Sequence, residues 1–294
     1  MRKVFAFMVL MGFLTSSVLA QEQAAENAAE PVAARSIKSE SASPNLPLWE
    51  AGLFGGGLTQ PAYPGADEQA NLVLGLPYVI YRGEYLRVDR GTVGVRAIKT
   101  PRTEVDVGFA ASLGSRAEDI QARHGMGDLG ILIEFGPRIK INLGEVSENG
   151  SASRIQFSMR GVLDANDHLS YRGIAFEPQW VKDMRLTNGW IISSNLGAIF
   201  GNQELVDTFY RVTPSEATPT RPAYEARSGL IALRASLFLS RLISPEIRFF
   251  SYMRFDSIAG AANYSSPLVR RDSGWTVGFG FAWTLARSER SAKD

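Results

Sequence analysis

The side chains best suited to nucleophilic or acid–base chemistry lie in one short segment. Residues 164–170 (DANDHLS) hold two aspartates, His168 and a serine, which are the residue types of a hydrolase triad. A polar turn after a strand explains the same composition, because a triad is defined by geometry in space. A hydrolase acting on lipid or another envelope substrate is therefore the least favoured of the functions considered.

Two pairs of carboxylates are the other candidates for chemistry. Glu104 and Asp106 would share one face of a strand, where arginine-rich surroundings favour ion pairs over a raised-pKa acid. Asp67 and Glu68 could touch a divalent cation, but a solvated acidic loop is the safer interpretation. We predict no catalytic, cofactor-binding or metal-ligating residues, and hence a protein that is not an enzyme.

Composition excludes several classes of function. The chain has no cysteine, so disulfides, thiolate metal sites and lipoprotein acylation are excluded. Its net charge of +1 gives no basis for binding nucleic acid. Six lysines stand against 25 arginines, and arginine is the better choice where charges pair in a confined space.

The chain divides into four predicted parts. Residues 1–20 have a basic start, an apolar stretch too short to span a bilayer, and small residues suited to signal cleavage after Ala20. Residues 21–46 have the composition of a flexible periplasmic linker. Residues 47–286 are predicted to form a β-barrel, for which the evidence follows, and residues 287–294 form a polar C-terminal tail. No later apolar run approaches the ~20 residues of a membrane helix, so any insertion must use strands.

Alternation of apolar and small or polar residues predicts the fold. Near the C-terminus, Trp275 to Leu285 alternate large apolar with small residues, as in a strand with one lipid-facing side. Similar patterns predict an all-β protein, a transmembrane antiparallel β-barrel of about 12 strands, with no convincing helix. If 84–90 and 92–99 are not full strands, the number is ten. The predicted strands are 48–59, 71–81, 84–90, 92–99, 103–113, 128–143, 152–165, 172–184, 188–201, 226–241, 245–257 and 273–286.

Loop lengths predict the orientation. When the connections between successive predicted strands are numbered along the chain, all the long ones have odd numbers and most of the even-numbered ones are tight turns. The long connections lie near 60–70, 114–127, 202–225 and 258–272. Outer-membrane barrels place short turns in the periplasm and long loops outside. The last strand is expected to pair with the first near Trp49, and its small inward residues to leave room for charged side chains opposite.

The predicted lumen face carries charges of both signs. A polar network that stiffens the barrel is favoured over a permeation path, because a selective pore would more often show charges of one sign. The core of this predicted network is Arg87, Asp89, Glu104, Asp106, Glu134, Arg138, Arg154, Arg160, Arg248, Arg254 and Asp256. The same face would hold Glu50, Arg96, Lys140, Asp164, Glu177, Arg234 and Glu246.

Several motifs between residues 48 and 286 resemble the MipA/OmpV family of outer-membrane proteins. They are 63–67 (YPGAD), 76–90 (LPYVIYRGEYLRVDR), 124–129 (HGMGDL), 218–226 (TPTRPAYEA) and 266–272 (SPLVRRD). The chain departs from the usual barrel pattern at its C-terminus, where a polar tail replaces a final aromatic residue. From the motif loops we single out Arg221, Tyr224, Arg270, Arg271 and Asp272, and expect the charged residues among them to hold the loops on the barrel mouth.

The resemblance implies an outer-membrane location and a scaffold role. In this family the namesake bridges a lytic transglycosylase and a bifunctional penicillin-binding protein during peptidoglycan growth, and other members are regarded as porin-like or adhesive. The leading hypothesis is therefore a non-enzymatic scaffold among outer-membrane lipids. The main alternative is a narrow porin-like channel for small solutes.

Overall fold

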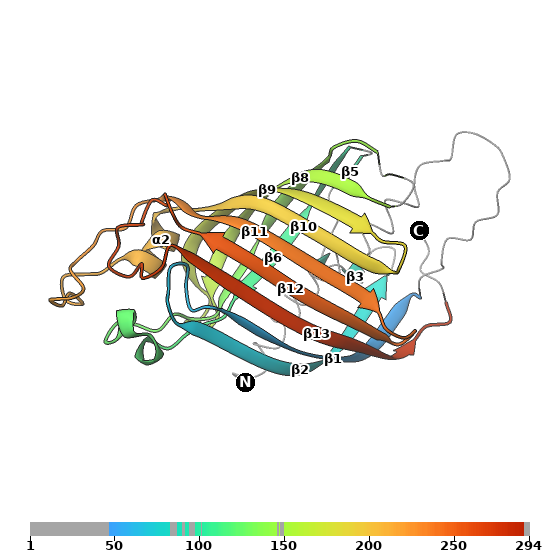
Figure 1. Cartoon of the computed structure of the whole chain (residues 1–294), viewed down its shortest axis with the longest axis horizontal. Helices are drawn as coiled ribbons and strands as arrows, with labels where there is room; N and C mark the ends of the chain where they lie inside the picture. The colour runs from blue at the N-terminus through green and yellow to red at the C-terminus, as the bar shows by residue number, and fades with distance from the viewer. Residues whose placement is uncertain are drawn as a thin grey trace.

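Strands make up most of the structure, as the alternating sequence predicts. The computed structural model describes residues 47–82, 87–89, 92–93, 98–100, 102–145, 147 and 150–290. The predicted signal peptide and linker lie outside these residues. The ten long strands are β1 (Trp49–Pro61), β2 (Gln69–Arg82), β6 (Thr103–Ser112), β7 (Leu132–Asn142), β8 (Ala152–Asp164), β9 (Ser170–Arg185), β10 (Trp190–Gly201), β11 (Gly229–Leu242), β12 (Ile247–Ser257) and β13 (Ser273–Arg287) (Figure 1).

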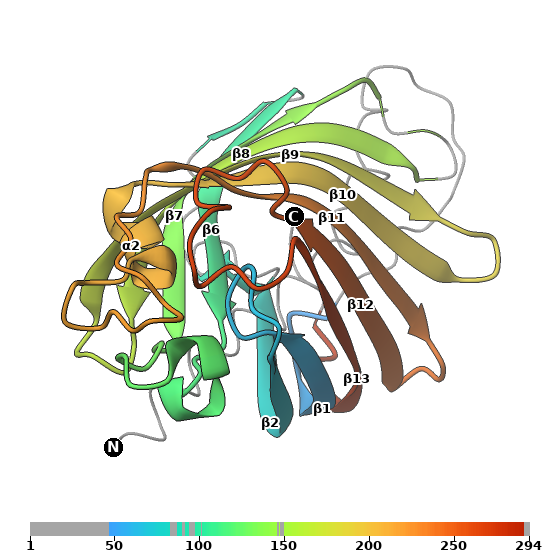
Figure 2. The same ribbon diagram turned by 60° about the vertical axis from the view of Figure 1, so that its left-hand side comes forward.

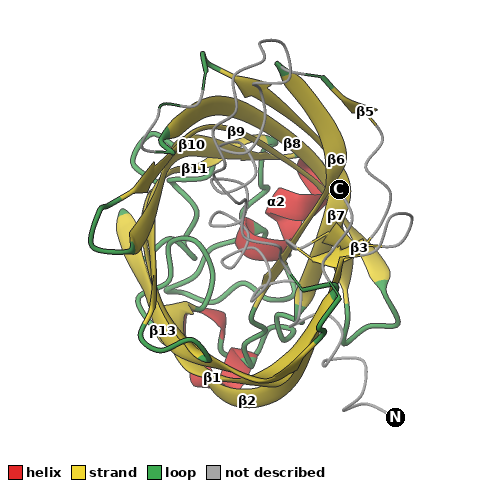
Figure 3. Ribbon diagram, turned by 90° about the vertical axis from the view of Figure 1, so that its right-hand side faces the viewer, coloured by secondary structure: helices red, strands yellow, loops and turns green. Residues whose placement is uncertain are grey.

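The strands form one antiparallel sheet that curls around a central lumen (Figure 3). Three short strands, β3 (Arg87–Asp89), β4 (Thr92–Val93) and β5 (Ile98–Lys99), lie at its two edges. The edges approach where β4 contacts β6, although no pairing joins β4 to β5 within the described residues. The prediction of an all-β, transmembrane antiparallel β-barrel is confirmed. Of the two uncertain predicted strands, 84–90 and 92–99, the structure describes only these three short pieces.

The last strand pairs with the first, as expected. Residues of β13 pair with β1 from Val277–Thr59 to Arg287–Glu50, and Ser288 N donates to Trp49 O at 2.8 Å. Both described ends of the chain therefore lie at the same end of the barrel. By the loop-length rule that end faces the periplasm.

The outer face of the barrel is apolar and carries aromatic residues near both ends. At the loop end Phe255 and Trp275 pack with ring centroids 4.9 Å apart, and at the turn end Phe249 lies 5.3 Å from Phe281. Trp275 and Trp283 are both more than half exposed. They are separated by about 27 Å of strand, which with strand tilt spans most of the roughly 25 Å apolar band of such barrels.

The lumen face also has an apolar wall, which the sequence analysis did not predict. Leu72, Leu74 and Leu76 of β2 point inward, because the alternate residues of this strand, such as Val73 at 87% exposure, point outward. On the neighbouring wall Phe238 and Phe250 are buried, and the Phe250 ring centroid lies 6.2 Å from that of Phe54. One wall of the lumen is thus apolar and the opposite wall, β6 to β9, is charged.

Glycines of β13 make room for this apolar wall. A Cβ on Gly280 would lie 2.6 Å from Phe54 Cζ, and a Cβ on Gly278 would lie 2.9 Å from Leu58 Cδ1. The small inward residues of the last strand therefore accommodate apolar side chains from β1. The expectation that they leave room for charged side chains is wrong at these two positions.

A helix in the connection between β10 and β11 was not predicted. α2 (Gln203–Tyr210) begins at Asn202, whose Oδ1 accepts from Leu205 N at 3.3 Å, as an N-cap does. Its buried side chains pack against inward residues of the sheet such as Val162 and Ile231, so α2 lies inside the barrel mouth (Figures 2 and 3). In the part of the chain that the structure describes, no helix is long and apolar enough to span a membrane.

Four loops at one end of the barrel form a single packed unit, which we call the cap. The cap consists of residues 62–68, 113–131, 202–228 and 258–272. Each loop contributes side chains to a shared apolar core, so the cap is held like the interior of a small domain. This core contains Ala62, Tyr63, Ala66, Ile120, Leu129, Val212 and Leu268.

Candidate functional site

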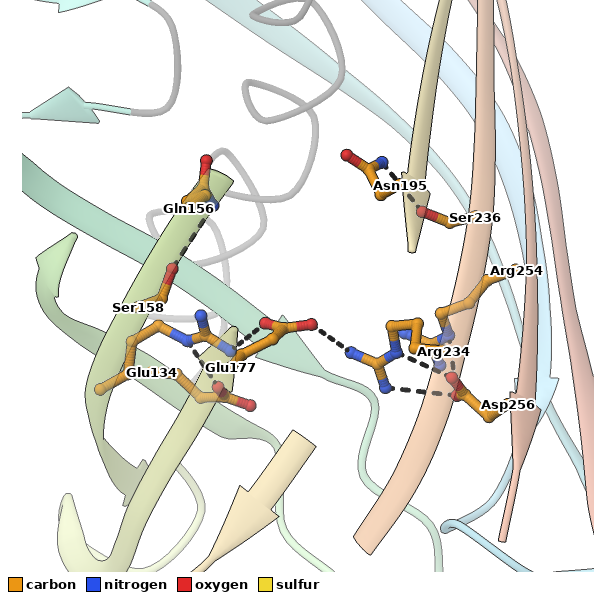
Figure 4. Close-up of polar contacts among 10 residues, drawn as sticks. Glu134, Gln156, Ser158, Glu177, Asn195, Arg234, Ser236, Arg254 and Asp256 are labelled. Carbon is orange, nitrogen blue, oxygen red and sulfur yellow. Dashed lines mark hydrogen bonds and ion pairs between the residues drawn. The ribbon is translucent and has the colours of Figure 1, made fainter. Parts of the chain in front are cut away.

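Six charged side chains in the lumen form a continuous series of ion pairs, which we call the charge chain (Figure 4). Arg160 of β8 donates to Glu134 at 2.9 Å and to Glu177 at 2.7 Å. Arg234 of β11 donates to Glu177 at 3.1 Å and to Asp256 at 2.7 Å. Arg254 Nε lies 3.0 Å from Asp256 Oδ2. Acids and arginines alternate throughout, so the charge chain is electrically neutral.

The charge chain passes over one strand of the sheet. Glu177 belongs to β9 and Arg234 to β11, with β10 between them. Gly197 of β10 is the register partner of Arg234 and presents no side chain to the lumen. The two charged groups therefore meet across a strand, which a pairwise reading of neighbouring strands does not anticipate.

Two further clusters pair the remaining charges of this wall. Asp106 accepts from Arg138 at 2.6 and 2.7 Å and from Lys140 at 2.9 Å, while Lys140 also donates to Glu104 at 3.2 Å. Side chains this buried are stable only when paired, because an isolated buried charge is costly. The arrangement braces the charged wall and offers no unpaired charge for acid–base chemistry within these clusters.

The second of these clusters contains Asp183, which the sequence analysis did not identify. Arg154 pairs with Asp183, which is fully buried and also accepts from Ser193 at 2.6 Å. Asp183 lies on the same face of β9 as Glu177, six residues away. A strict period of two from Glu177 would have found it.

Of the predicted network core, the structure places Arg248 on the lumen face and describes only the backbone of Arg87 and Asp89. The backbone of Arg87 and Asp89 lies in β3, but their side chains lie outside the described residues, as does Arg96. Arg248 of β12 lies on the inward face opposite Ala282. The remaining eight residues named for the core of the network all lie on the charged wall or in the charge chain.

Arg221 fastens one cap loop to another. Its Nη1 donates to Ala122 O and His124 O, each at 3.0 Å, while Nη2 donates to Glu216 O at 2.7 Å. Glu216 in turn accepts from Thr213 N and Oγ1 at 2.9 and 2.7 Å. A single guanidinium thus joins the loop 113–131 to the loop 202–228.

Arg123 also connects cap loops, and the sequence analysis did not identify it. It is 5% exposed, donates to Phe209 O at 3.3 Å and lies over the Tyr63 ring at 5.8 Å. Tyr63 donates to Leu268 O at 2.7 Å, and burial raises the pKa of this phenol. Only its position beside the motif 124–129 marked Arg123 in the sequence, and that gave no hint of its partners.

The other motif residues hold the cap in different ways. Tyr224 Oη lies 3.4 Å from Asn263 Oδ1 and 3.4 Å from Ser265 Oγ. Arg270 and Arg271 are fixed through the backbone, since their N–H groups donate to Gly65 O at 2.8 and 3.1 Å. Their side chains are exposed.

The loop that resembled a hydrolase triad does not bring those groups together as a triad. Ser170 Oγ donates to Asp167 Oδ2 at 2.8 Å, and the fully exposed His168 has Nδ1 3.8 Å from Asp167 Oδ1. This hydrogen bond, together with the nearby charge of Arg172, lowers the pKa of Asp167. The serine therefore donates to the carboxylate and lacks the activating base that a nucleophile needs.

The acidic pair of the first loop is partly enclosed. Glu68 Oε1 accepts from Gln121 N at 2.8 Å, and partial burial and a hydrogen bond with Asp67 raise the pKa of Glu68. Across the described residues, no group of three or more potential metal ligands is found. The pair lies at the contact between two cap loops and connects them.

Fold and site together define an outer-membrane-type β-barrel with a packed cap of loops at one end and a charged wall that is braced by ion pairs. The chain belongs to the family described as MltA-interacting protein MipA, whose model matches residues 53–285. A search of curated proteins finds no match.

Solved structures give weaker similarities. The NanC porin is 10% identical with a TM-score of 0.38, covering 79% of this chain and 100% of the porin. The COG4313 outer membrane channel from Pseudomonas putida F1 is 10% identical with a TM-score of 0.38, covering 87% and 99%. Outer membrane phospholipase A from Escherichia coli is 8% identical with a TM-score of 0.32, covering 80% and 92%. These likenesses are too low to transfer an activity to this chain.

Proposed function

We propose that this chain is a non-enzymatic scaffold of the outer membrane that binds a lytic transglycosylase, and through it a penicillin-binding protein, at its periplasmic end. The cap is the observation that carries the proposal. Because four loops share one apolar core at the loop end of the barrel, they form one packed unit there, and the scaffold proposal takes this unit to restrict the passage of solutes. The family membership adds the class of partner, since its description names an interaction with MltA.

The turn between β11 and β12 is the surface that best suits such a partner. Leu242 and Ile243 are 50% and 61% exposed at the periplasmic end. The turn is held by Ile243 N donating to Ile247 O at 2.9 Å. Exposed aliphatic side chains on a fixed turn are suitable anchors for a protein interface, whose binding energy concentrates in a few buried apolar contacts.

Binding measurements with two matched variants test the proposal. The purified protein in detergent is immobilised and titrated with a lytic transglycosylase. Ile243→Asp is expected to weaken binding by about tenfold or more, since a loss of ~1.4 kcal/mol at an anchor has that effect. Thr187→Asp, an exposed polar position in the β9–β10 turn, is expected to leave it unchanged. If the unaltered protein shows no binding, the scaffold proposal is wrong.

Planar-bilayer recording separates the scaffold from a narrow channel. With the cap packed, the purified protein is expected to give no reproducible conductance steps. Regular steps that persist after removal of other porins would instead support the channel.

Lipid and peptidoglycan hydrolysis assays are expected to show no activity, and an activity lost in His168→Ala would overturn the non-enzymatic assignment.

Export by a cleaved signal peptide completes the proposal. Cleavage after Ala20 would leave residues 21–46 as a tether in the periplasm. N-terminal sequencing of the outer-membrane form is expected to begin at Gln21.

A further inference from the structure

A pocket at the outer rim of the barrel has the composition of an anion site. The pocket has a volume of about 520 Å³ and lies where the last cap loop enters β13. Two arginines and a tyrosine supply hydrogen-bond donors, and one carboxylate balances part of the charge. Its lining residues are Tyr264, Val269, Arg270, Arg271, Asp272 and Ser273.

The arginines of this pocket differ from those of the lumen and the cap. The guanidinium groups of Arg160, Arg221 and Arg234 donate hydrogen bonds to carboxylate or carbonyl oxygens of the protein. Among the described residues, neither the Arg270 nor the Arg271 guanidinium has a hydrogen-bond or ion-pair partner, and both side chains are exposed. Their donors are therefore available to a ligand.

The backbone that carries these arginines is already fixed. Both N–H groups donate to Gly65 O, Ile258 N donates to Asp272 O at 2.8 Å, and the adjacent Leu268 is fully buried. A ligand would not have to order this segment on binding. The entropic cost of binding is then confined to the arginine side chains.

The position of the pocket along the barrel axis indicates where its ligand would come from. Ser273 is two residues before Trp275, which with Phe255 forms the outermost aromatic pair on the lipid face of these strands. Aromatic residues of this kind mark the interface between hydrocarbon and head groups. The pocket therefore adjoins the head-group layer of the outer leaflet.

We propose that this pocket binds a phosphate monoester, presented by the head group of a phosphorylated outer-leaflet lipid. Adjacent guanidinium groups suit phosphate because each can donate two parallel hydrogen bonds to its oxygens. Tyr264 supplies a further donor. Asp272, whose Oδ1 accepts from Ser273 Oγ at 3.2 Å, can accept from a sugar hydroxyl of such a head group. The site is at the opposite end of the barrel from the proposed partner surface, so each can fail independently.

Lipid binding to four forms of the full-length protein tests the site. The probes are diphosphorylated lipid A, the same lipid after phosphatase treatment, and glucosamine phosphate in solution. Arg270→Gln/Arg271→Gln is expected to weaken binding of the phosphorylated lipid by about tenfold or more, because several charge-assisted hydrogen bonds are lost. Arg270→Lys/Arg271→Lys should give an intermediate loss, since charge is kept but paired donation is lost. Arg227→Gln, an exposed cap arginine outside the pocket, is the control and should bind like the unaltered protein.

The probes distinguish the sources of the phosphate. Preferential binding of the phosphorylated lipid supports a lipid head group. Equal binding of glucosamine phosphate, lost in the double glutamine variant, supports the site but assigns it to a soluble ester. If the double glutamine variant, folded as judged by heat-modified gel migration, binds every probe as the unaltered protein does, the proposal is overturned.

Discussion

Glu177 on β9 accepts a hydrogen bond from Arg234 on β11 at 3.1 Å, although β10 lies between their strands. Glu177 also accepts from Arg160 at 2.7 Å on the other side. This carboxylate therefore connects the two halves of the charge chain. Its side chain is only 10% exposed, so its loss leaves two arginines poorly compensated in a confined space.

Glu177→Gln is predicted to lower the free energy of unfolding by about 3–5 kcal/mol, the usual cost of breaking a buried pair. Urea unfolding in lipid vesicles measures this change. Asp119→Asn is the control, because its ion pair with Arg116 is on the surface with side chains 69% and 60% exposed. The control should cost less than about 1 kcal/mol. Equal effects of the two substitutions would contradict a bracing role for the charge chain.

Gly280→Ala is predicted to destabilise the junction between the last and first strands by about 1–3 kcal/mol, the range found for overpacking. Its Cβ would lie 2.6 Å from Phe54 Cζ and 2.9 Å from Gly55 O. Gly55→Ala is the matched control on the adjacent strand, because a Cβ there meets nothing within 4 Å. The midpoint of thermal unfolding, followed by gel migration, should fall for the first variant only.

Arg221→Met is predicted to loosen the cap. Loss of hydrogen bonds to a charged group costs about 2–3 kcal/mol, which corresponds to roughly 30- to 140-fold faster amide exchange in the two joined loops. Hydrogen exchange at 113–131 and 202–228 measures this, with Arg227→Met as an exposed control from the same loop. Unchanged exchange in Arg221→Met would show that the apolar core holds the cap without this fastening.

The cap is also predicted to weaken in acid through Glu216. Burial opposes ionisation of this carboxyl, but hydrogen bonds from Thr213 and the charges of Arg123 and Arg221 outweigh it and lower its pKa. Because the folded pKa is below the unfolded one, the ionised group stabilises the cap at pH values above the ordinary glutamate pKa of 4.5. This contribution is lost as the pH falls through the lowered pKa. Exchange rates in 202–228 should therefore rise in acid. In Glu216→Gln this part of the pH dependence should disappear.

The sequence predicted the strands well because a pleated strand must alternate its faces. The strip from Trp275 to Leu285 fixed the outward face of β13, and loop lengths ordered the two ends of the barrel. The same reasoning failed on β2, where Leu72 and Val73 are both apolar. Period two gives no direction to a strand with two apolar faces, so the apolar wall of the lumen was not foreseen.

The helix α2 carried a weak local signal that strand patterns obscured. Asn202 before Leu205, Val206 and Phe209 gives an N-cap followed by helical spacing. Eight residues are too few for periodicity alone to establish a helix, and such a short helix depends on tertiary packing. Here that packing is supplied by the inner wall of the barrel.

The sequence by itself indicated the β architecture, the pairing of the last strand with the first, and many of the charged residues on the inward faces of the strands, because these follow from a two-residue period and from where the polar residues fall. Only the tertiary structure decided that Glu177 reaches Arg234 over Gly197 and that Arg221 and Arg123 fasten separate loops into a cap. It also decided that the guanidinium groups of Arg270 and Arg271 have no hydrogen-bond or ion-pair partner among the described residues. These relationships join residues from non-adjacent strands or distant loops. Their distances depend on barrel curvature and loop packing, which no local pattern encodes.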